Sequence, residues 1–307
     1  MVSDKYTKLR QLLQSYGSCV VAYSGGVDSA FLAYVAHDVL GPKALAVLAD
    51  SPSLPRRELE QALGLGRQFA FPVRVVRTQE FQNPSYLANP NNRCYFCKHE
   101  LFTELVPLAK SEGFAVIAYG ENASDVGDYR PGAQAASEFQ VRAPLKEVGL
   151  TKAEIRELST KLGLPTADKP QMACLSSRVP YGETVTPAKL SMIEGAENIL
   201  RDLGFYDVRV RHHELTSMPN WVPSGQMAPA PEVSGVKNPM ILHLARIEVG
   251  PSEMQKFLED GMSGKVAKAL KQIGYAHVTL DLEGYRRGSG NNVLESVVLA
   301  PETSSNE

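Results

Sequence analysis

The stretch Ala22-Tyr23-Ser24-Gly25-Gly26-Val27-Asp28-Ser29 follows directly on the apolar run Cys19–Val21. A short β-prone run, two glycines and an Asp-Ser pair before an apolar segment indicate a strand, a turn and the start of a helix. Because the two glycines lack a Cβ atom, the backbone can take a positive φ and approach an oxyanion closely. The hydroxyls of Ser24 and Ser29, and the positive end of the following helix, favour the same kind of ligand. The stretch therefore predicts a phosphate-binding loop, one that lacks the lysine of a Walker A loop.

Strand and helix patterns alternate around this loop. The predicted strands are 18–23, 44–49, 73–77 and 114–119. The predicted helices are 4–16, 28–40, 56–71, 95–112 and 150–162. This alternation predicts an α/β fold with a doubly wound parallel sheet and right-handed crossovers, Rossmann-like in its arrangement. Ligands of such sheets bind beyond the carboxyl ends of the strands, so we expect the loops that begin at Ser24, Asp50 and Gly120 to meet there.

A second, smaller α+β domain is expected over residues 176–295, after a first domain of residues 1–175. Its predicted helices are 187–203 and 252–273, the second with a break at 261–264, and its predicted strands are 206–211, 241–249 and 276–282. Between the first two strands, residues 213–239 contain five prolines and the only tryptophan. This composition predicts an irregular insertion. Residues 296–307 are expected to form a frayed tail.

Charge and composition limit the classes of function. The chain has 307 residues, 43% of them hydrophobic, and a formal net charge of −2. This charge argues against a wholly basic surface for nucleic acid. We find no apolar run of membrane-spanning length and no apolar region at the N-terminus. We therefore expect no membrane partner, a cytoplasmic location and reduced cysteines.

The cysteines leave several interpretations open. We expect Cys19, inside the first predicted strand, to be a small buried hydrophobe. Cys94 and Cys97 form a C-x-x-C pair, which suits a redox pair, half of a zinc site or two unrelated thiols. Together with Cys174, three thiolates can also hold a cubane iron–sulfur cluster and leave one iron open for an extra sulfide. Cys174 alone is alternatively a nucleophile whose pKa Arg178 lowers, or an inert core thiol.

The glycine loop resembles the pyrophosphatase loop, or PP-loop, of the ATP pyrophosphatases. That resemblance implies MgATP as substrate and transfer of AMP to a carboxyl or carbonyl oxygen, with release of pyrophosphate. Three further segments, together with this loop, resemble the LarE family: Ala173–Arg178, Val208–His212 and Ala245–Glu248, with Gly284–Arg286 fitting the same region. This second resemblance covers residues 5–290. The chain departs from the family in the insertion described above.

Members of the LarE family are ATP-dependent sulfur transferases that build the pincer ligand of the nickel cofactor of lactate racemase. The resemblance implies that the carboxylates of pyridinium-3,5-dicarboxylate mononucleotide are adenylated and then converted to thiocarboxylates. In one branch a cysteine at the position of Cys174 gives up its own sulfur. In another branch three cysteines hold a [4Fe–4S] cluster, and Cys94, Cys97 and Cys174 resemble that branch. A homo-oligomer is also implied, and the sulfur source, including a donor protein, stays open.

These considerations assign roles to individual residues. The ATP phosphates are expected to contact the loop residues Ser24, Gly25, Gly26, Val27, Asp28 and Ser29. We expect Asp28 to help place Mg²⁺ as well. Asp50 and Ser51 are expected to border the adenosine, and Asp125, with Asp128, to contact Mg²⁺ or substrate. Arg209 and Arg211 alternate on one strand face, as a phosphate fork requires. The family assigns them, with Arg246, to the phosphate of the mononucleotide, and matches Glu197 and Glu248 to acidic positions near subunit contacts.

Three other functions compete with this one. A PP-loop enzyme that thiolates tRNA also adenylates and sometimes carries a three-cysteine cluster, but it predicts a basic face or an added zinc module. An ammonia-using synthetase would leave the cysteines idle, and no glutaminase region is visible. A non-catalytic nucleotide-sensing or cluster-sensing module would bind AMP without forming pyrophosphate.

Overall fold

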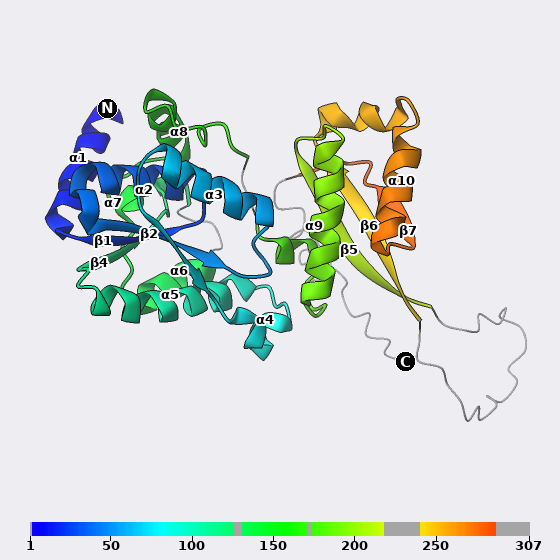
Figure 1. The fold of residues 1–307 in the computed structure, drawn as a ribbon, viewed down its shortest axis with the longest axis horizontal. Coiled ribbons are helices and arrows are strands. Elements are labelled where there is room, and N and C mark those ends of the chain that lie inside the picture. Colours follow the sequence, from blue (N-terminus) through cyan, green and yellow to red (C-terminus); the bar gives the residue numbers. More distant parts are fainter. Residues whose placement is uncertain (1, 126–130, 171–172, 218–239, 287–307) are drawn as a thin grey trace, which may run out of the picture. The chain divides into compact units, whose positions relative to one another are not determined.

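The computed structural model describes residues 2–125, 131–170, 173–217 and 240–286. The chain divides into two compact units. The first comprises Met1–Leu175 and Tyr181–Pro187, and the second comprises Ser176–Pro180 and Ala188–Glu307. Each unit has its own sheet with its own helices (Figure 1). The domain roles predicted from the sequence stay predictions.

The first unit contains a four-stranded parallel sheet in the order β3-β2-β1-β4. Its strands are β1 (Cys19–Tyr23), β2 (Ala44–Asp50), β3 (Val73–Arg77) and β4 (Val116–Tyr119). Its longer helices are α1 (Val2–Tyr16), α2 (Val27–Leu40), α3 (Arg56–Gln68), α5 (Arg93–Ser111), α6 (Pro131–Glu138) and α8 (Lys152–Lys161). Two shorter ones are α4 (Pro84–Leu87) and α7 (Pro144–Glu147). The α/β fold with a parallel sheet is confirmed.

Helices cover both faces of this sheet, and β1 shows why (Figure 1). All five residues of β1 are buried, as the continuous apolar run predicts for a central parallel strand. Val21 faces the core that includes α1, α2, α3 and α8. Its neighbours Val20 and Ala22 face the core formed with α5 and α6. Helical layers on both faces leave the carboxyl ends of the strands as the place for a ligand.

The second unit is a three-stranded sheet in the order β5-β6-β7, backed by two helices. The strands are β5 (Val208–Ser217), β6 (Met240–Val249) and β7 (His277–Leu280), and the helices are α9 (Pro187–Asp202) and α10 (Met262–Ile273). β5 and β6 are antiparallel, whereas β6 and β7 are parallel. Alternate residues such as Val208, Val210 and Ile247 join the core with α9 and α10, so the sheet has one apolar and one polar face.

The structure corrects the sequence predictions at two places in this unit. Residues 213–217, assigned to the irregular insertion, belong to β5 and pair with 240–244 of β6. The alternation of facing residues simply continues beyond the predicted strand end. The predicted helix 252–273 is a 3₁₀ helix, Pro251–Leu258, followed by α10. The remainder of the insertion and the tail, 296–307, lie outside the described residues. Among the helices that the structure describes, none combines the length and apolarity needed to cross a membrane.

Candidate functional site

The glycine loop joins β1 to α2 with a backbone that only glycine accommodates at one position. Gly25 has a φ of +71°, and a Cβ atom there would lie 2.7 Å from the Cβ of Ala62. Gly26 forms the N-cap of α2 with extended backbone, and a Cβ there would meet only the Ser24 Oγ, at 3.5 Å. The two glycines therefore differ in kind. Position 25 requires glycine because of its positive φ and its close packing against Ala62, whereas position 26 has room for a methyl group.

Hydroxyl groups fix the shape of this loop. The Oγ of Ser29 accepts a hydrogen bond from the backbone N–H of Ser24 at 3.1 Å and lies 3.0 Å from the Ser24 Oγ. The first turn of any α-helix carries N–H groups without intrahelical acceptors, and it is the positive end of the helix dipole. The loop therefore presents hydroxyls and the start of α2 as donors for an anion.

The end of β4 packs closely against this helix start. A Cβ at Gly120 would lie 2.9 Å from the backbone N of Ser29 and 3.1 Å from the backbone C of Asp28. Gly120 is therefore needed for the approach of the two segments. The sequence predicted that the loops beginning at Ser24, Asp50 and Gly120 would meet, and the structure brings the loops at Ser24 and Gly120 together.

A cavity of about 410 Å³ opens at this junction. Its lining combines the glycine loop, the end of β4 and parts of α5 and α6. The lining residues are Ala22, Ser24, Gly26, Asp28, Ser29, Cys94, Lys98, Tyr119, Gly120, Glu121, Pro131, Gly132 and Ala133. Four of the six loop residues named from the sequence therefore share a cavity with one of the three candidate cluster cysteines.

Three lysines that the sequence analysis did not select lie at or beside the loop. Lys98 lines the cavity, and burial lowers the pKa of its ammonium group even though Cys97 and Cys94 oppose that effect. The Nζ of Lys152 contacts the Oδ2 of Asp28 at 2.5 Å. The Nζ of Lys169 donates to the carbonyl of Gly25 at 3.2 Å.

The residues expected to contact the adenosine and Mg²⁺ form hydrogen bonds with residues near them in the sequence. Asp50 accepts from Arg56 at 2.6 Å, and the Oγ of Ser51 lies 2.8 Å from that of Ser53. Asp125 accepts from the backbone N–H of Asn122 within its own turn. None of the three is among the described residues that line the cavity. Their assignment to ATP stays a prediction, and Asp128 lies outside the described residues.

The three candidate cluster cysteines interact electrostatically within the first unit. Burial first, and then the charges of Glu80, Cys174 and Cys94, raise the pKa of the Cys97 thiol. Burial lowers the pKa of the Arg93 guanidinium, but the thiols of Cys174 and Cys94 outweigh that effect and raise it. In the described part of the chain, the three thiols do not form a group tight enough for a single metal ion.

Cys19 and Cys174 have different surroundings. Cys19 is fully buried in β1, which agrees with the expected small hydrophobic core residue. Burial raises the pKa of its thiol to about 12. Cys174 is half-buried, and the next residue, Leu175, donates its N–H to the carbonyl of Ser53 at 2.9 Å. Arg178, which the sequence analysis expected to act on Cys174, is fully buried in the second unit and donates to Glu197 there. Its effect on Cys174 stays a prediction.

Three arginines that the sequence analysis selected, Arg209, Arg211 and Arg246, share the polar face of the sheet in the second unit. Arg209 lies opposite Glu248, and Arg211 lies opposite Arg246, in the β5–β6 register. The guanidinium of Arg211 binds the Glu248 carboxylate through two hydrogen bonds of 3.0 Å. Arg246 contacts the same carboxylate at 3.1 Å and also pairs with Asp281.

Arg209 has a different environment on that face. It is only 4% exposed, and its guanidinium lies 4.7 Å from the ring centre of Tyr285. Its Nη1 donates to the carbonyl of Val208 at 2.7 Å and lies 3.8 Å from Asp207. The predicted clustering of arginines is therefore present, but protein acceptors already compensate their charges.

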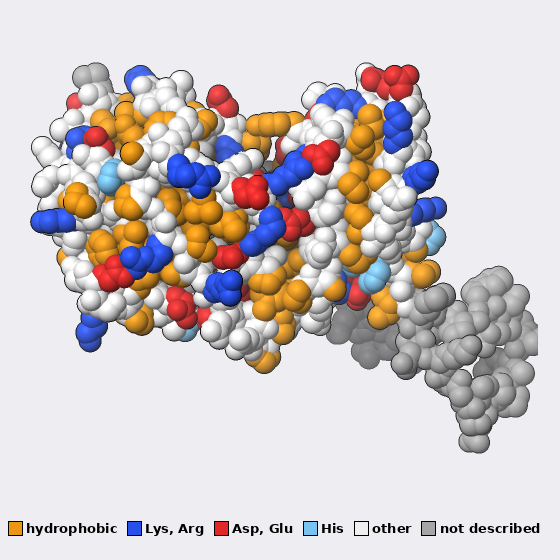
Figure 2. All heavy atoms as spheres, in the orientation of Figure 1, with side chains coloured by type: hydrophobic (Ala, Val, Ile, Leu, Met, Phe, Trp, Pro, Cys, Tyr) orange, Lys and Arg blue, Asp and Glu red, His pale blue; other side chains and the backbone are white. Residues whose placement is uncertain are grey.

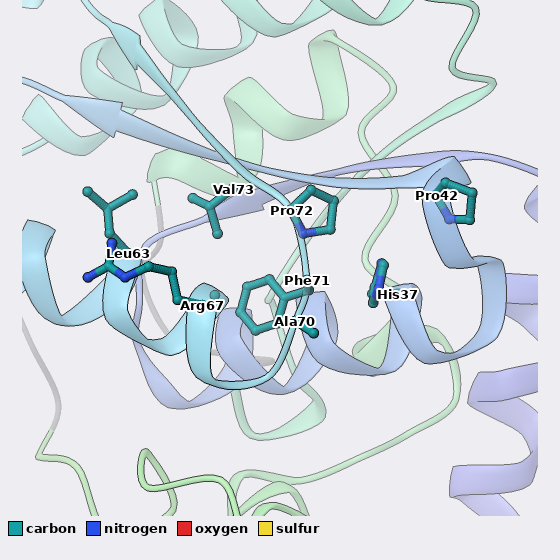
Figure 3. A pocket seen from close by; sticks show the side chains of 9 residues that line it. His37, Pro42, Leu63, Arg67, Ala70, Phe71, Pro72 and Val73 are labelled. Atoms are coloured by element: carbon teal, nitrogen blue, oxygen red, sulfur yellow. The ribbon is translucent and has the colours of Figure 1, made fainter.

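A larger hollow of about 630 Å³ lies at the amino end of β3 (Figure 3). It is lined by His37, Pro42, Leu63, Gly66, Arg67, Ala70, Phe71, Pro72 and Val73. None of these residues belongs to the glycine loop. Ligands of parallel sheets bind at the carboxyl ends of the strands, so the size of this hollow does not make it the candidate site.

The parallel sheet and the glycine loop with its cavity define an α/β protein of the PP-loop class. The family described as NAD synthase matches residues 1–87. A glutamine-hydrolysing GMP synthase of Phenylobacterium zucineum is 30% identical, covering 62% of this chain and 41% of that protein.

Two relatives match almost the whole chain. An uncharacterised protein of Synechocystis is 43% identical over 96% of this chain and 99% of its own length. The pyridinium-3,5-bisthiocarboxylic acid mononucleotide synthase of Lactiplantibacillus plantarum is 30% identical over 97% of this chain and 98% of its own length. The chain therefore belongs to the family of this synthase, the LarE family.

Proposed function

We propose that the protein is an ATP-dependent sulfur transferase. It adenylates the carboxylates of pyridinium-3,5-dicarboxylate mononucleotide and converts them to thiocarboxylates for the nickel-pincer cofactor of lactate racemase. The observation that carries the proposal is the cavity in which the glycine loop shares a wall with Cys94 and Lys98. The product in the name of the L. plantarum relative, a bisthiocarboxylic acid mononucleotide, supports the choice of substrate.

In the first step, a substrate carboxylate oxygen attacks the α-phosphorus of ATP. The bond from that phosphorus to the pyrophosphate oxygen breaks, and pyrophosphate leaves. The hydroxyls of Ser24 and Ser29 and the start of α2 stabilise the phosphate charge, because their donors are fixed before ATP binds. Asp28 helps to place Mg²⁺ once Lys152 moves from its carboxylate to a phosphate oxygen. Lys98 is placed to bind the same charge.

In the second step, a sulfur nucleophile attacks the adenylated carbon. A C–S bond forms, the C–O bond to AMP breaks, and AMP leaves. Cys94, Cys97 and Cys174 are the residues that would hold a [4Fe–4S] cluster, because three thiols are suitable iron ligands and all three belong to the first unit, where they interact electrostatically. A bound cluster would supply an open iron that carries sulfide. Without it, Cys174 is the sulfur donor, consumed once per chain unless a donor protein restores it.

The phosphate of the mononucleotide is assigned to the arginine face of the second unit. A phosphate dianion offers several oxygens to the planar guanidiniums of Arg209, Arg211 and Arg246. To bind them it replaces part of the contact that Glu248 now makes. We also propose a homo-oligomer, on the ground of family membership.

The experiment that tests this function measures pyrophosphate release and the mass of the product together. With MgATP, substrate and an iron or sulfide supply, the wild type should release pyrophosphate and exchange oxygen for sulfur in the substrate. Cys174→Ala should still release pyrophosphate but yield no thiocarboxylate. Ser29→Ala should lose both, and Ser15→Ala, an exposed serine of α1, should lose neither. Substrate-independent pyrophosphate release by the wild type, with no thiocarboxylate, would contradict the proposal.

Thiolation of tRNA is the alternative outcome of the same experiment. On the face shown in Figure 2, Lys and Arg side chains of the first unit are interspersed with Asp and Glu. A tRNA-binding surface favours clustered basic residues instead. Replacement of the mononucleotide by tRNA should therefore give no pyrophosphate above background.

A further inference from the structure

A cluster of potential metal ligands lies in the second unit, apart from every residue assigned above. His212 and Glu214 are alternate residues of β5, and His243 of β6 lies directly opposite Glu214. All three belong to the sheet face that carries the core residues Val210 and Ala245. One possible ligand atom of each residue lies within 4.8 Å of those of the other two. The strand period of two and the β5–β6 register therefore bring the three side chains together.

Two imidazole nitrogens in this cluster lack hydrogen-bond partners. The Nε2 of His212 and the Nδ1 of His243 are both buried and unpartnered. His212 is fully buried as a residue, and the two rings lie with their centres 4.9 Å apart. Buried polar atoms in proteins nearly always have a partner, because the desolvation of an unpaired group is costly. Two such atoms next to a carboxylate form a set of donors that can bind a cation.

Neighbouring groups orient the ligands for that role. The hydroxyl of Tyr275 lies 3.2 Å from the Nδ1 of His212. When Nδ1 carries the proton and donates it to Tyr275, the lone pair of Nε2 faces the cluster. Lys189 contacts the Oε2 atom of Glu214 at 3.0 Å. The half-exposed Glu214 and His243 leave the cluster open to an ion from solvent.

We propose that His212, Glu214 and His243 form a binding site for a divalent transition-metal ion. Two imidazoles and one carboxylate are a donor set that suits zinc and its first-row neighbours, with a water molecule in the remaining position. The ion ties β5 to β6 beyond the predicted end of β5. This proposal is independent of the proposed sulfur transfer.

The test measures zinc bound by the full-length protein after treatment with EDTA, using equilibrium dialysis. The wild type should hold one more Zn²⁺ per chain than His243→Ala, because the variant removes one of three ligands. Zinc bound by the thiols is common to both proteins, so it cancels in the difference. His277→Ala, which removes an exposed histidine of β7, is the matched control and should bind as much zinc as the wild type.

A second measurement guards against a folding defect in the variant. Zinc should raise the melting temperature of the wild type and of His277→Ala, but not that of His243→Ala, which keeps a native circular dichroism spectrum. Equal zinc content and equal thermal shifts in the wild type and His243→Ala would overturn the proposal. An equal loss of zinc in His277→Ala would overturn it as well.

Discussion

The glycine loop of the first unit and the arginine face of the second unit were both predicted to bind phosphate, yet they are built in opposite ways. The loop uses uncharged donors, hydroxyls and a helix start, which line a cavity. The arginine face uses formal charges, and Glu248 and Asp281 already compensate two of the three guanidiniums. If both bind phosphate as proposed, the loop is fixed before the anion arrives, whereas the arginine face must exchange a carboxylate for the phosphate. Residue type identifies an anion site, but only the structure shows whether its charge is already in use.

The largest effect should come from a methyl group at the loop. Gly25→Ala places a Cβ atom 2.7 Å from the Cβ of Ala62, at a residue with a positive φ. The loop must therefore shift, and its hydrogen-bond donors no longer point at the phosphate. We expect pyrophosphate release to fall about 1,000-fold, the effect of losing a fixed oxyanion donor. Gly26→Ala is the matched control, because its Cβ meets only the Ser24 Oγ at 3.5 Å. Equal losses in the two variants would show that the geometry of the loop is not what fixes the phosphate.

The second-largest effect should be a difference in acid sensitivity between the two units. Burial raises the pKa of the Glu197 carboxyl, but Arg178 and then Arg201 outweigh it, so the pKa lies below its ordinary value. Its stabilising contribution is therefore complete above the unfolded pKa of about 4.5 and is lost as the pH falls through the folded pKa. Glu197→Gln also leaves the buried Arg178 without its counter-charge, which costs about 3 kcal/mol at neutral pH.

Chemical denaturation at several pH values measures this effect. The free energy of unfolding of the second unit should fall below pH 4.5 in the wild type, and that fall should be smaller in Glu197→Gln. Glu194→Gln, one turn earlier on α9, should keep the wild-type pH dependence. An unchanged pH dependence in Glu197→Gln would mean that other carboxylates control the acid sensitivity of this unit.

A smaller effect is expected from replacing one guanidinium by an ammonium. Arg211→Lys keeps the charge but loses the planar fork that binds Glu248 through two hydrogen bonds. We expect KM for the mononucleotide to rise about tenfold, or about 1.4 kcal/mol, with KM for ATP unchanged. Arg74→Lys, at an exposed ion pair of the first unit, should change neither value. A rise in KM for ATP alone would place the arginine face outside the mononucleotide site.

The sequence predicted the features that follow from local periodicity. The strand–loop–helix around Ser24 and the shared face of Arg209 and Arg211 arise from patterns within a few residues, and the parallel sheet follows from the alternation of strand and helix patterns. The acidic partners of the arginines were not predicted, because they depend on register between strands. Lys152 and Lys169 reach the loop from distant segments through flexible side chains, which no spacing in the sequence encodes. The end of β5 was missed because prolines farther along the insertion suggested an irregular segment too early.

The central claim is that adenylation and sulfur supply meet at the glycine-loop cavity, through Cys94, Cys97 and Cys174. Its most direct test is the iron and acid-labile sulfide content of protein purified without oxygen. We predict about four irons per chain in the wild type and in Cys19→Ala, and their loss in Cys94→Ala. Absence of iron in the wild type after anaerobic reconstitution, or iron that persists in Cys94→Ala, would contradict the claim.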